Sequence, residues 1–168
     1  MLEIRSALAD AKSFSHPDVS LTEAPDFVLT QLAGSDKDLQ KCLGKLPGKV
    51  GVVLEHRDFQ VLRIAPHQLW VLGDAPKTAS GVYATSLSSG RTRIALSGSR
   101  ARELLSACAA IDFHPDNFKP GHFVLTGIHH TPVLIQCIGE DTFHIFGLRT
   151  FAQNLWEWLC DVAEGLEG

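Results

Sequence analysis

Histidine is the residue type in this chain best suited to metal or acid–base chemistry. There are eight histidines: His16, His56, His67, His114, His122, His129, His130 and His144. None has the His-Glu-x-x-His spacing that places two ligands on one face of a helix. The adjacent pair, His129 and His130, falls at an expected hairpin turn, and neighbouring strand side chains point to opposite faces. The pattern therefore favours solvated or hydrogen-bonded histidines and predicts no metal site.

Nucleophile and phosphate motifs are also absent from the sequence. Ser97-Gly98-Ser99 is not the Gly-x-Ser-x-Gly of a hydrolase elbow. The glycines form neither a dinucleotide-binding loop nor a Walker loop. Residues 95–100 open an expected helix, whose N-terminus could hold an anion weakly. We predict no catalytic residue in this chain.

Three polar residues are candidates for contact with a ligand or a partner. Arg91 and Arg93 project from the same face of an expected strand, and a guanidinium can pair bidentately with a carboxylate. The alternative for both arginines is a solvated face. Asp112 precedes Phe-His-Pro. If buried, it could act as a general base or bind a folate-like amine, and otherwise it ties down the turn before Pro115.

The last expected helix, from Thr150 onward, carries two of the three tryptophans. Thr150 and Gln153 have the spacing of a capping box. The apolar arc of this helix covers about half of its surface, which is wider than the usual stripe of ~100°. We predict that Trp158 lies in the core and that Trp156 lies near an edge that meets a partner. The alternative is that both edges of the helix are covered by its own domain.

Composition places the chain among ordinary globular proteins. It has 168 residues, of which 45% are hydrophobic and 20% are charged. A net charge of −4 argues against a nucleic-acid or anionic-membrane surface. The start of the chain lacks the basic-then-apolar order of a signal peptide, and Cys42, Cys108, Cys137 and Cys160 are far apart. We therefore expect reduced cysteines, a cytoplasmic protein and no membrane or nucleic-acid partner.

The order of elements indicates an α+β fold, with antiparallel sheets and packed helices. We expect a loosely ordered N-terminal segment over residues 1–34 and a single α+β domain over residues 35–168. A helix over 35–43 is capped by Ser35 and closed by Gly44, and a second helix over 100–109 is capped by Ser99. Residues 75–90 form a small-residue connection. The expected strands cover residues 50–54, 59–64, 69–72, 91–96, 122–128, 133–138 and 142–146.

From residue 86 onward, the order of short motifs resembles the gamma subunit of heterotetrameric sarcosine oxidase. The motifs are Ser-Leu-Ser-Ser-Gly-Arg-Thr at 86–92, Ile-Asp-Phe-His-Pro at 111–115, Phe-Lys-Pro-Gly at 118–121 and Arg-Thr-Phe-Ala-Gln-Asn-Leu-Trp-Glu-Trp-Leu at 149–159. The chain departs from the family pattern at Ser86 and Ser89, which replace Asp and His, and at Ser99, which replaces Pro. The resemblance covers about half of the chain.

The resemblance implies a fold like the tetrahydrofolate-binding domain of the glycine-cleavage aminomethyltransferase. It implies a small non-catalytic subunit of a sarcosine oxidase or a related N-methyl-amine oxidase, with larger alpha and beta subunits as partners. FAD, FMN, NAD and tetrahydrofolate are then cofactors of the complex, and this chain binds none of them. Two alternatives remain: a stand-alone tetrahydrofolate-dependent one-carbon transferase anchored by Asp112, and a free-standing binding module.

Overall fold

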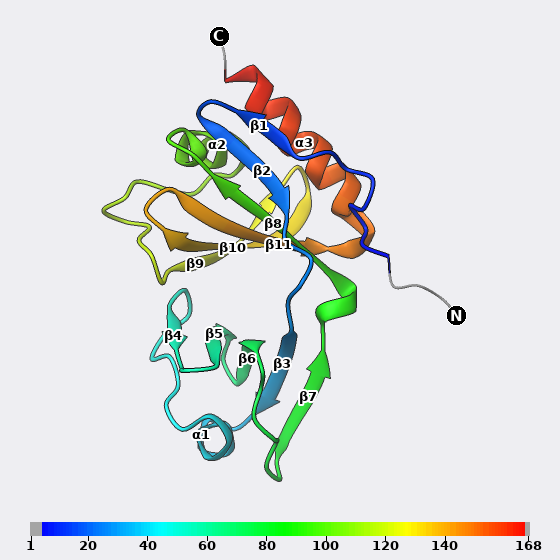
Figure 1. The fold of residues 1–168 in the computed structure, drawn as a ribbon. Helices are drawn as coiled ribbons and strands as arrows, with labels where there is room; N and C mark the ends of the chain where they lie inside the picture. Colours follow the sequence, from blue (N-terminus) through cyan, green and yellow to red (C-terminus); the bar gives the residue numbers. More distant parts are fainter. Residues whose placement is uncertain (1–4, 167–168) are drawn as a thin grey trace. The chain divides into compact units, whose positions relative to one another are not determined.

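The computed structural model describes residues 5–166, which form two antiparallel sheets and three α-helices (Figure 1). The chain divides into two compact units. Unit 1 takes in the chain up to Pro25, Gly90–Pro120 and the chain from Val124 onward. Unit 2 consists of Asp26–Ser89 and Gly121–Phe123. Each unit is built on one of the sheets, and each is described separately.

Unit 1 contains a six-stranded sheet with the strand order β1-β2-β8-β11-β10-β9. In strand β8, Thr92, Ile94 and Leu96 are buried and alternate with more exposed residues, as the sequence predicts. Ile94 lies opposite Glu23 on one side and Ile145 on the other, which fixes the register of the central strands. The strands are β1 (Phe14–His16), β2 (Val19–Glu23), β8 (Arg91–Ser97), β9 (Phe123–Ile128), β10 (Thr131–Gly139) and β11 (Thr142–Leu148).

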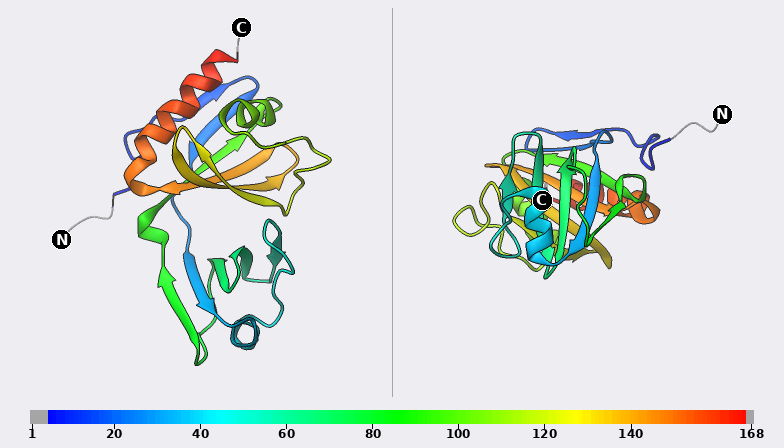
Figure 2. Two further views of the ribbon diagram at one scale, coloured as in Figure 1. Left: turned by 180° about the vertical axis from the view of Figure 1, so that it is seen from behind. Right: turned by 90° about the horizontal axis from the view of Figure 1, so that it is seen from below.

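Two helices cover one face of this sheet: α2 (Ala101–Cys108) and α3 (Ala152–Gly165) (Figure 2). A short 3-10 turn, Arg149–Phe151, leads into α3. The core between helices and sheet includes Leu104 and Leu159, both of which are fully buried. Burying one leucine side chain stabilises a fold by about 1.5–3 kcal/mol, so this layer holds unit 1 together.

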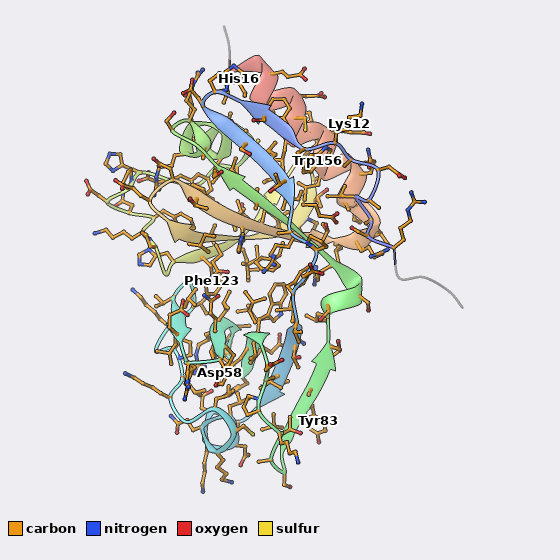
Figure 3. The ribbon with its side chains drawn as sticks, viewed as in Figure 1. Lys12, His16, Asp58, Tyr83, Phe123 and Trp156 are labelled. Atoms are coloured by element: carbon orange, nitrogen blue, oxygen red, sulfur yellow. The ribbon has the colours of Figure 1, made fainter. Side chains whose placement is uncertain are left out.

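The two tryptophans of α3 lie the opposite way round from our prediction. Trp156 is 6% exposed and belongs to the core of unit 1 (Figure 3). Trp158 is only partly buried. The buried line of α3 runs through Leu155, Trp156, Leu159 and Ala163, so the helix is rotated toward Trp156. A wide apolar arc admits either rotation, because both choices bury several large side chains.

Both expected side-chain caps in unit 1 are wrong. Ser99 does not cap α2, since its hydroxyl donates to Asp18 Oδ1 at 2.8 Å and thereby ties the helix start to the β1–β2 turn. The capping box that would join residue 150 to Gln153 is not formed. The Gln153 amide instead donates to Glu157 Oε1 at 2.8 Å. In the 3-10 turn before α3, the Ala152 amide donates to the Arg149 carbonyl. The start of the helix is therefore hydrogen-bonded without a side-chain cap.

Unit 2 contains a five-stranded sheet with the order β4-β5-β6-β3-β7, and helix α1 (Asp36–Leu43). The predicted caps of α1 are confirmed: Ser35 Oγ accepts from the Asp38 amide at 3.2 Å, and Gly44 has φ of 74°. The core of this unit includes Leu32, Leu39 and Leu69. The strands are β3 (Leu29–Gly34), β4 (Val53–Glu55), β5 (Phe59–Ala65), β6 (Gln68–Gly73) and β7 (Val82–Ser86).

The expected loose segment over residues 1–34 and single domain over 35–168 differ from the structure. Residues 1–4 lie outside the described part, but β1, β2 and β3 all fall before residue 35. Strand β2 is internal, paired with β8 through Ser20 and Ser97, and β3 lies between β6 and β7. The serines and prolines around these strands mark turns rather than disorder. Within residues 5–166, no helix is long and apolar enough to cross a membrane.

Candidate functional site

Arg91 and Arg93 lie on the face of β8 opposite to its buried residues Thr92 and Ile94. Arg93 Nε donates to the carbonyl oxygen of Ala24 at 3.0 Å, and the Ala24 amide donates to the Arg93 carbonyl at 2.9 Å. Arg93 therefore anchors the chain where it leaves β2. Burial lowers the pKa of Arg91. Neither arginine is a simple solvated side chain, and a contact with a partner remains a prediction.

His144 of β11 shares this face, since it pairs with Ala95 of β8. Burial, followed by the positive charge of Arg93, lowers the pKa of His144 from 6.5 to about 4. The imidazole is therefore neutral at pH 7. Its ring meets the ring of Phe146 edge-on, with 6.2 Å between centroids. Sequence reasoning counted His144 among eight histidines and gave it no separate role.

Asp112 follows α2 in an exposed loop. Its Oδ1 accepts from the His114 amide at 2.9 Å, and its Oδ2 accepts from the Asn117 side chain. These two hydrogen bonds, the backbone one first, lower the pKa of the carboxyl. Asp112 thus ties down the turn before Pro115, and it is not the buried carboxylate that a folate anchor requires.

Arg102 joins several polar groups of unit 1 by hydrogen bonds, and the sequence did not single it out as important. From α2 its guanidinium donates to the carbonyl oxygens of Phe113 at 2.6 Å and Phe118 at 3.0 Å, and to Asp141 Oδ1 at 3.1 Å. It also lies 5.1 Å from the centre of the Phe143 ring. Its side chain is 13% exposed. No spacing signal points to it, because most of its partners are backbone carbonyls from distant loops.

A groove opens between the outer side of α3 and the β9–β10 turn. It has a volume of about 250 Å³ and is lined by His129, Asn154, Glu157, Trp158 and Asp161. The four helical residues are spaced at i, i+3, i+4 and i+7, so they form one face of α3. The His129 ring stacks on the Trp158 indole, with 4.0 Å between centroids and 14° between planes.

The turn that carries His129 has an unusual backbone. His129 has φ of 44° and His130 has φ of 62°. These are left-handed values, which glycine and asparagine favour in two-residue hairpin turns. The left-handed region costs other residues about 1–2 kcal/mol each. The sequence predicted the turn at this histidine pair, but it gave no sign that one ring would stack on a tryptophan of the last helix.

Two of the residues that line the groove, Glu157 and Asp161, are acidic. The Glu157 carboxylate is held by the Gln153 amide, and Asp161 lies one turn further along α3. Burial, followed by the charges of Glu164, Asp161 and Glu157, raises the pKa of the nearby Cys160 thiol to about 11. Within residues 5–166, no group of three or more histidine, cysteine or acidic side chains is arranged to hold a metal ion.

The structure does not bring the four predicted contact residues together. Arg91 and Arg93 share one face of β8, Asp112 lies in the loop after α2, and Trp156 is covered by the core. The groove beside Trp158 is instead the site where aromatic and charged side chains converge from two elements.

Comparison with known proteins identifies the relatives of this chain. The model of the "Sarcosine oxidase, gamma subunit family" matches residues 74–165. The curated sarcosine oxidase subunit gamma of Corynebacterium sp. (strain P-1) is 29% identical over 98 residues, which are 58% of this chain and 46% of that protein. The chain therefore spans about half the length of this curated relative.

Two solved structures share the fold. A chain of the heterotetrameric sarcosine oxidase from Corynebacterium sp. U-96, in complex with pyrrole 2-carboxylate, matches with a TM-score of 0.84 and 21% identity, over 98% of this chain and 96% of that chain. Aminomethyltransferase T of the glycine cleavage system from Bartonella henselae matches with a TM-score of 0.62 and 16% identity, over 86% of this chain and 46% of that one. The expected aminomethyltransferase-like fold is confirmed.

Proposed function

Because the chain belongs to the sarcosine oxidase gamma subunit family, we propose that it is the small, non-catalytic gamma-type subunit of a heterotetrameric sarcosine oxidase or a related N-methyl-amine oxidase. The observation that carries this proposal is the family match over residues 74–165, which includes β8, α2 and all of α3. In this assignment the larger alpha and beta subunits are the partners. They hold FAD, FMN, NAD and tetrahydrofolate and carry out the oxidative demethylation.

The chemistry of the titratable side chains supports a non-catalytic role. His144 is neutral because its pKa is lowered to about 4, and burial raises the pKa of Cys108 to about 11. Asp112 is engaged in its own turn. A thiol nucleophile is activated by a lowered pKa, and the raised pKa of Cys108 is the opposite of that condition. The surface of the chain, rather than a reaction centre, is then its contribution.

A stand-alone one-carbon transferase gains no support from the structure. That function would need a buried polar anchor for the folate amine, and Asp112 is exposed. We place the assembly in the cytoplasm, because Cys42, Cys108, Cys137 and Cys160 are all free thiols, which fits a reducing compartment.

Co-purification tests the proposed function. The chain, carrying an affinity tag, is expressed together with the alpha and beta chains of a sarcosine oxidase from the same genome. We expect it to elute from a size-exclusion column with a large flavin-absorbing complex that oxidises an N-methylated amine. Omitting the chain should lower the yield of assembled complex. Elution as a free monomer in the presence of those chains, or turnover of an amine by the purified chain alone, would contradict the proposal.

A further inference from the structure

All of the charged side chains of α3 are acidic. Its first turn has no acidic residue, and its last turn has no basic residue. Glu157, Asp161 and Glu164 all fall after its first turn. A helix C-terminus carries partial negative charge within its last turn, so the dipole disfavours Glu164, whereas Glu157 and Asp161 lie further from the helix end. In the part of the chain that the structure describes, no lysine or arginine pairs with Glu157 or Asp161.

Two aromatic rings line the groove together with these acids. The rings of His129 and Trp158 stack on each other, and the groove that they line also includes Glu157 and Asp161. A guanidinium is planar and can stack on an aromatic ring while donating to a carboxylate, which an ammonium does less well. The volume of about 250 Å³ is below the range of about 300–1,000 Å³ typical of cofactor and drug sites. It fits one long side chain better than a cofactor.

The backbone conformation of the β9–β10 turn supports the same interpretation of the groove. His129 and His130 both adopt left-handed φ values, although a pair such as Asn-Gly would do so at lower cost. Strained residues of this kind persist where the position of a side chain matters. Here the strained turn places the His129 ring on Trp158 at the edge of the groove.

We propose that this groove receives an arginine side chain from a larger subunit of the oxidase complex. The inference rests on the proposed function as a gamma-type subunit. The guanidinium stacks on the His129–Trp158 pair and donates to Glu157 and Asp161, and its charge offsets the acids of α3. The groove is then a point of attachment that holds unit 1 to its partner.

Charge-neutral variants of the two acids test the proposal. Glu157→Gln combined with Asp161→Asn keeps the shape of the groove and removes both charges. The matched control is Glu164→Gln on the same helix, because Glu164 does not line the groove. The dissociation constant between the tagged chain and the assembled remaining subunits is measured over a range of salt concentrations. We expect the double variant to bind at least about tenfold more weakly, with a flatter salt dependence, and the control to stay within about twofold.

A second variant separates loss of the groove from loss of the fold. His129→Gly accepts the left-handed backbone and removes the ring that stacks on Trp158. It should weaken binding while the melting temperature of the chain changes little.

The outcomes distinguish the two proposals. If the wild-type chain binds and both variants match it in affinity and salt dependence, the groove proposal is overturned and the subunit assignment stands. If the wild-type chain binds no oxidase subunit, both proposals fail. Saturable binding of a free methylated amine in this groove of the assembled complex would also overturn the inference, since a small ligand would then occupy the site.

Discussion

Through a single guanidinium, Arg102 contacts two loops of unit 1, the α2–β9 loop and the β10–β11 turn. Replacing it with alanine leaves the carbonyls of Phe113 and Phe118 without their donor and removes the charge above Phe143. Hydrogen bonds from charged donors are worth about 1.5–3 kcal/mol each, and unpaired carbonyls add a penalty. We expect Arg102→Ala to lower the free energy of unfolding by about 3 kcal/mol, measured by urea denaturation.

Arg100 provides the matched control for that measurement. It lies two residues earlier, and its guanidinium pairs with Glu103 at 2.7 Å on the exposed side of α2. Exposed ion pairs contribute little to stability. Arg100→Ala should therefore have a much smaller effect than Arg102→Ala, and equal losses from the two substitutions would contradict the role given to Arg102.

The lowered pKa of His144 predicts how the stability of the chain depends on pH. In the unfolded chain its pKa is near 6.5, whereas in the folded chain it is about 4, because burial and Arg93 disfavour the charged ring. Between these two values the unfolded state binds more protons, so stability falls as the pH is lowered from about 6.5 toward 4. We expect the chain to lose about 1–2 kcal/mol between pH 7 and pH 5. His144→Gln should flatten this dependence in urea titrations, and an unchanged slope would contradict the assignment.

At the residue scale, the sequence predicts local roles better than long-range ones. The turn role of Asp112 follows from its position before Pro115, and the histidine pair was placed correctly in a hairpin turn. The contacts of Arg102 and the stacking of His129 on Trp158 join residues that are far apart in the chain. No local pattern encodes such pairs, because they depend on how the elements pack.

At the scale of the element, α3 divides its tryptophans between two environments. Trp156 lies in the core and Trp158 lies at the groove. Trp156→Ala should lower the free energy of unfolding by about 3–5 kcal/mol, as for a large side chain removed from a core. Trp158→Ala should cost clearly less, because this side chain is partly exposed. Chemical denaturation of both variants measures the difference, and a larger loss at Trp158 would contradict the observed rotation of α3.

The start of α2 depends on Gly98. This residue has φ of 127°, and an added Cβ would overlap the carbonyl oxygen of Asp18. Gly98→Ala should lower the free energy of unfolding by more than about 2 kcal/mol, since both the backbone and its neighbour would have to move. Gly90→Ala is the control, because a Cβ there meets nothing within 4 Å. It should change stability by less than about 1 kcal/mol in the same thermal or urea unfolding experiment.

Elements with strong local signals could be predicted, and those that depend on their neighbours could not. Helix α1 begins and ends at the residues expected from Ser35 and Gly44. Strand β7 was missed because it lies in a stretch rich in small residues and only Val82 of the strand is buried, so its place in the sheet comes from pairing with β3. The rotation of α3 was wrong for a related reason, since its wide apolar arc does not select one face.

At the scale of the whole molecule, the sheet of unit 1 is assembled from distant segments. Ser20 of β2 pairs with Ser97 of β8, while all the strands of unit 2 lie between them in the sequence. Pairings at such separation form late, because the loop must close before the contact stabilises it. Unit 2 is complete once residue 123 has been made.

A fragment of residues 1–123 tests this order. It contains all of unit 2 but lacks β10, β11 and α3. We expect amide hydrogen exchange to show protection in β3, β5 and β6 and little protection in β2. Equal protection in β2 would contradict the view that the sheet of unit 1 needs the end of the chain.

The fold class and the family could be predicted from the sequence, whereas the division into units could not. Motifs from residue 86 onward carry the resemblance, and the family match over residues 74–165 covers the same region. The N-terminal strands share no such motifs, and their partner β8 lies about half the chain away. Domain boundaries read from composition alone miss units that are built from several segments.

The position of strand β7 at the edge of its sheet affects how readily copies of this chain associate. It ends the strand order of its sheet, and Tyr83 on it is 77% exposed (Figure 3). The residues from Val82 to Ser86 include no lysine and no proline, the residues that commonly prevent an edge strand from pairing with another chain. Copies produced in excess would present a ready template for stacking on one another. Under the proposed assignment, synthesis of this chain in step with its partner subunits limits such stacking, and co-expression at matched levels is the route to recombinant material.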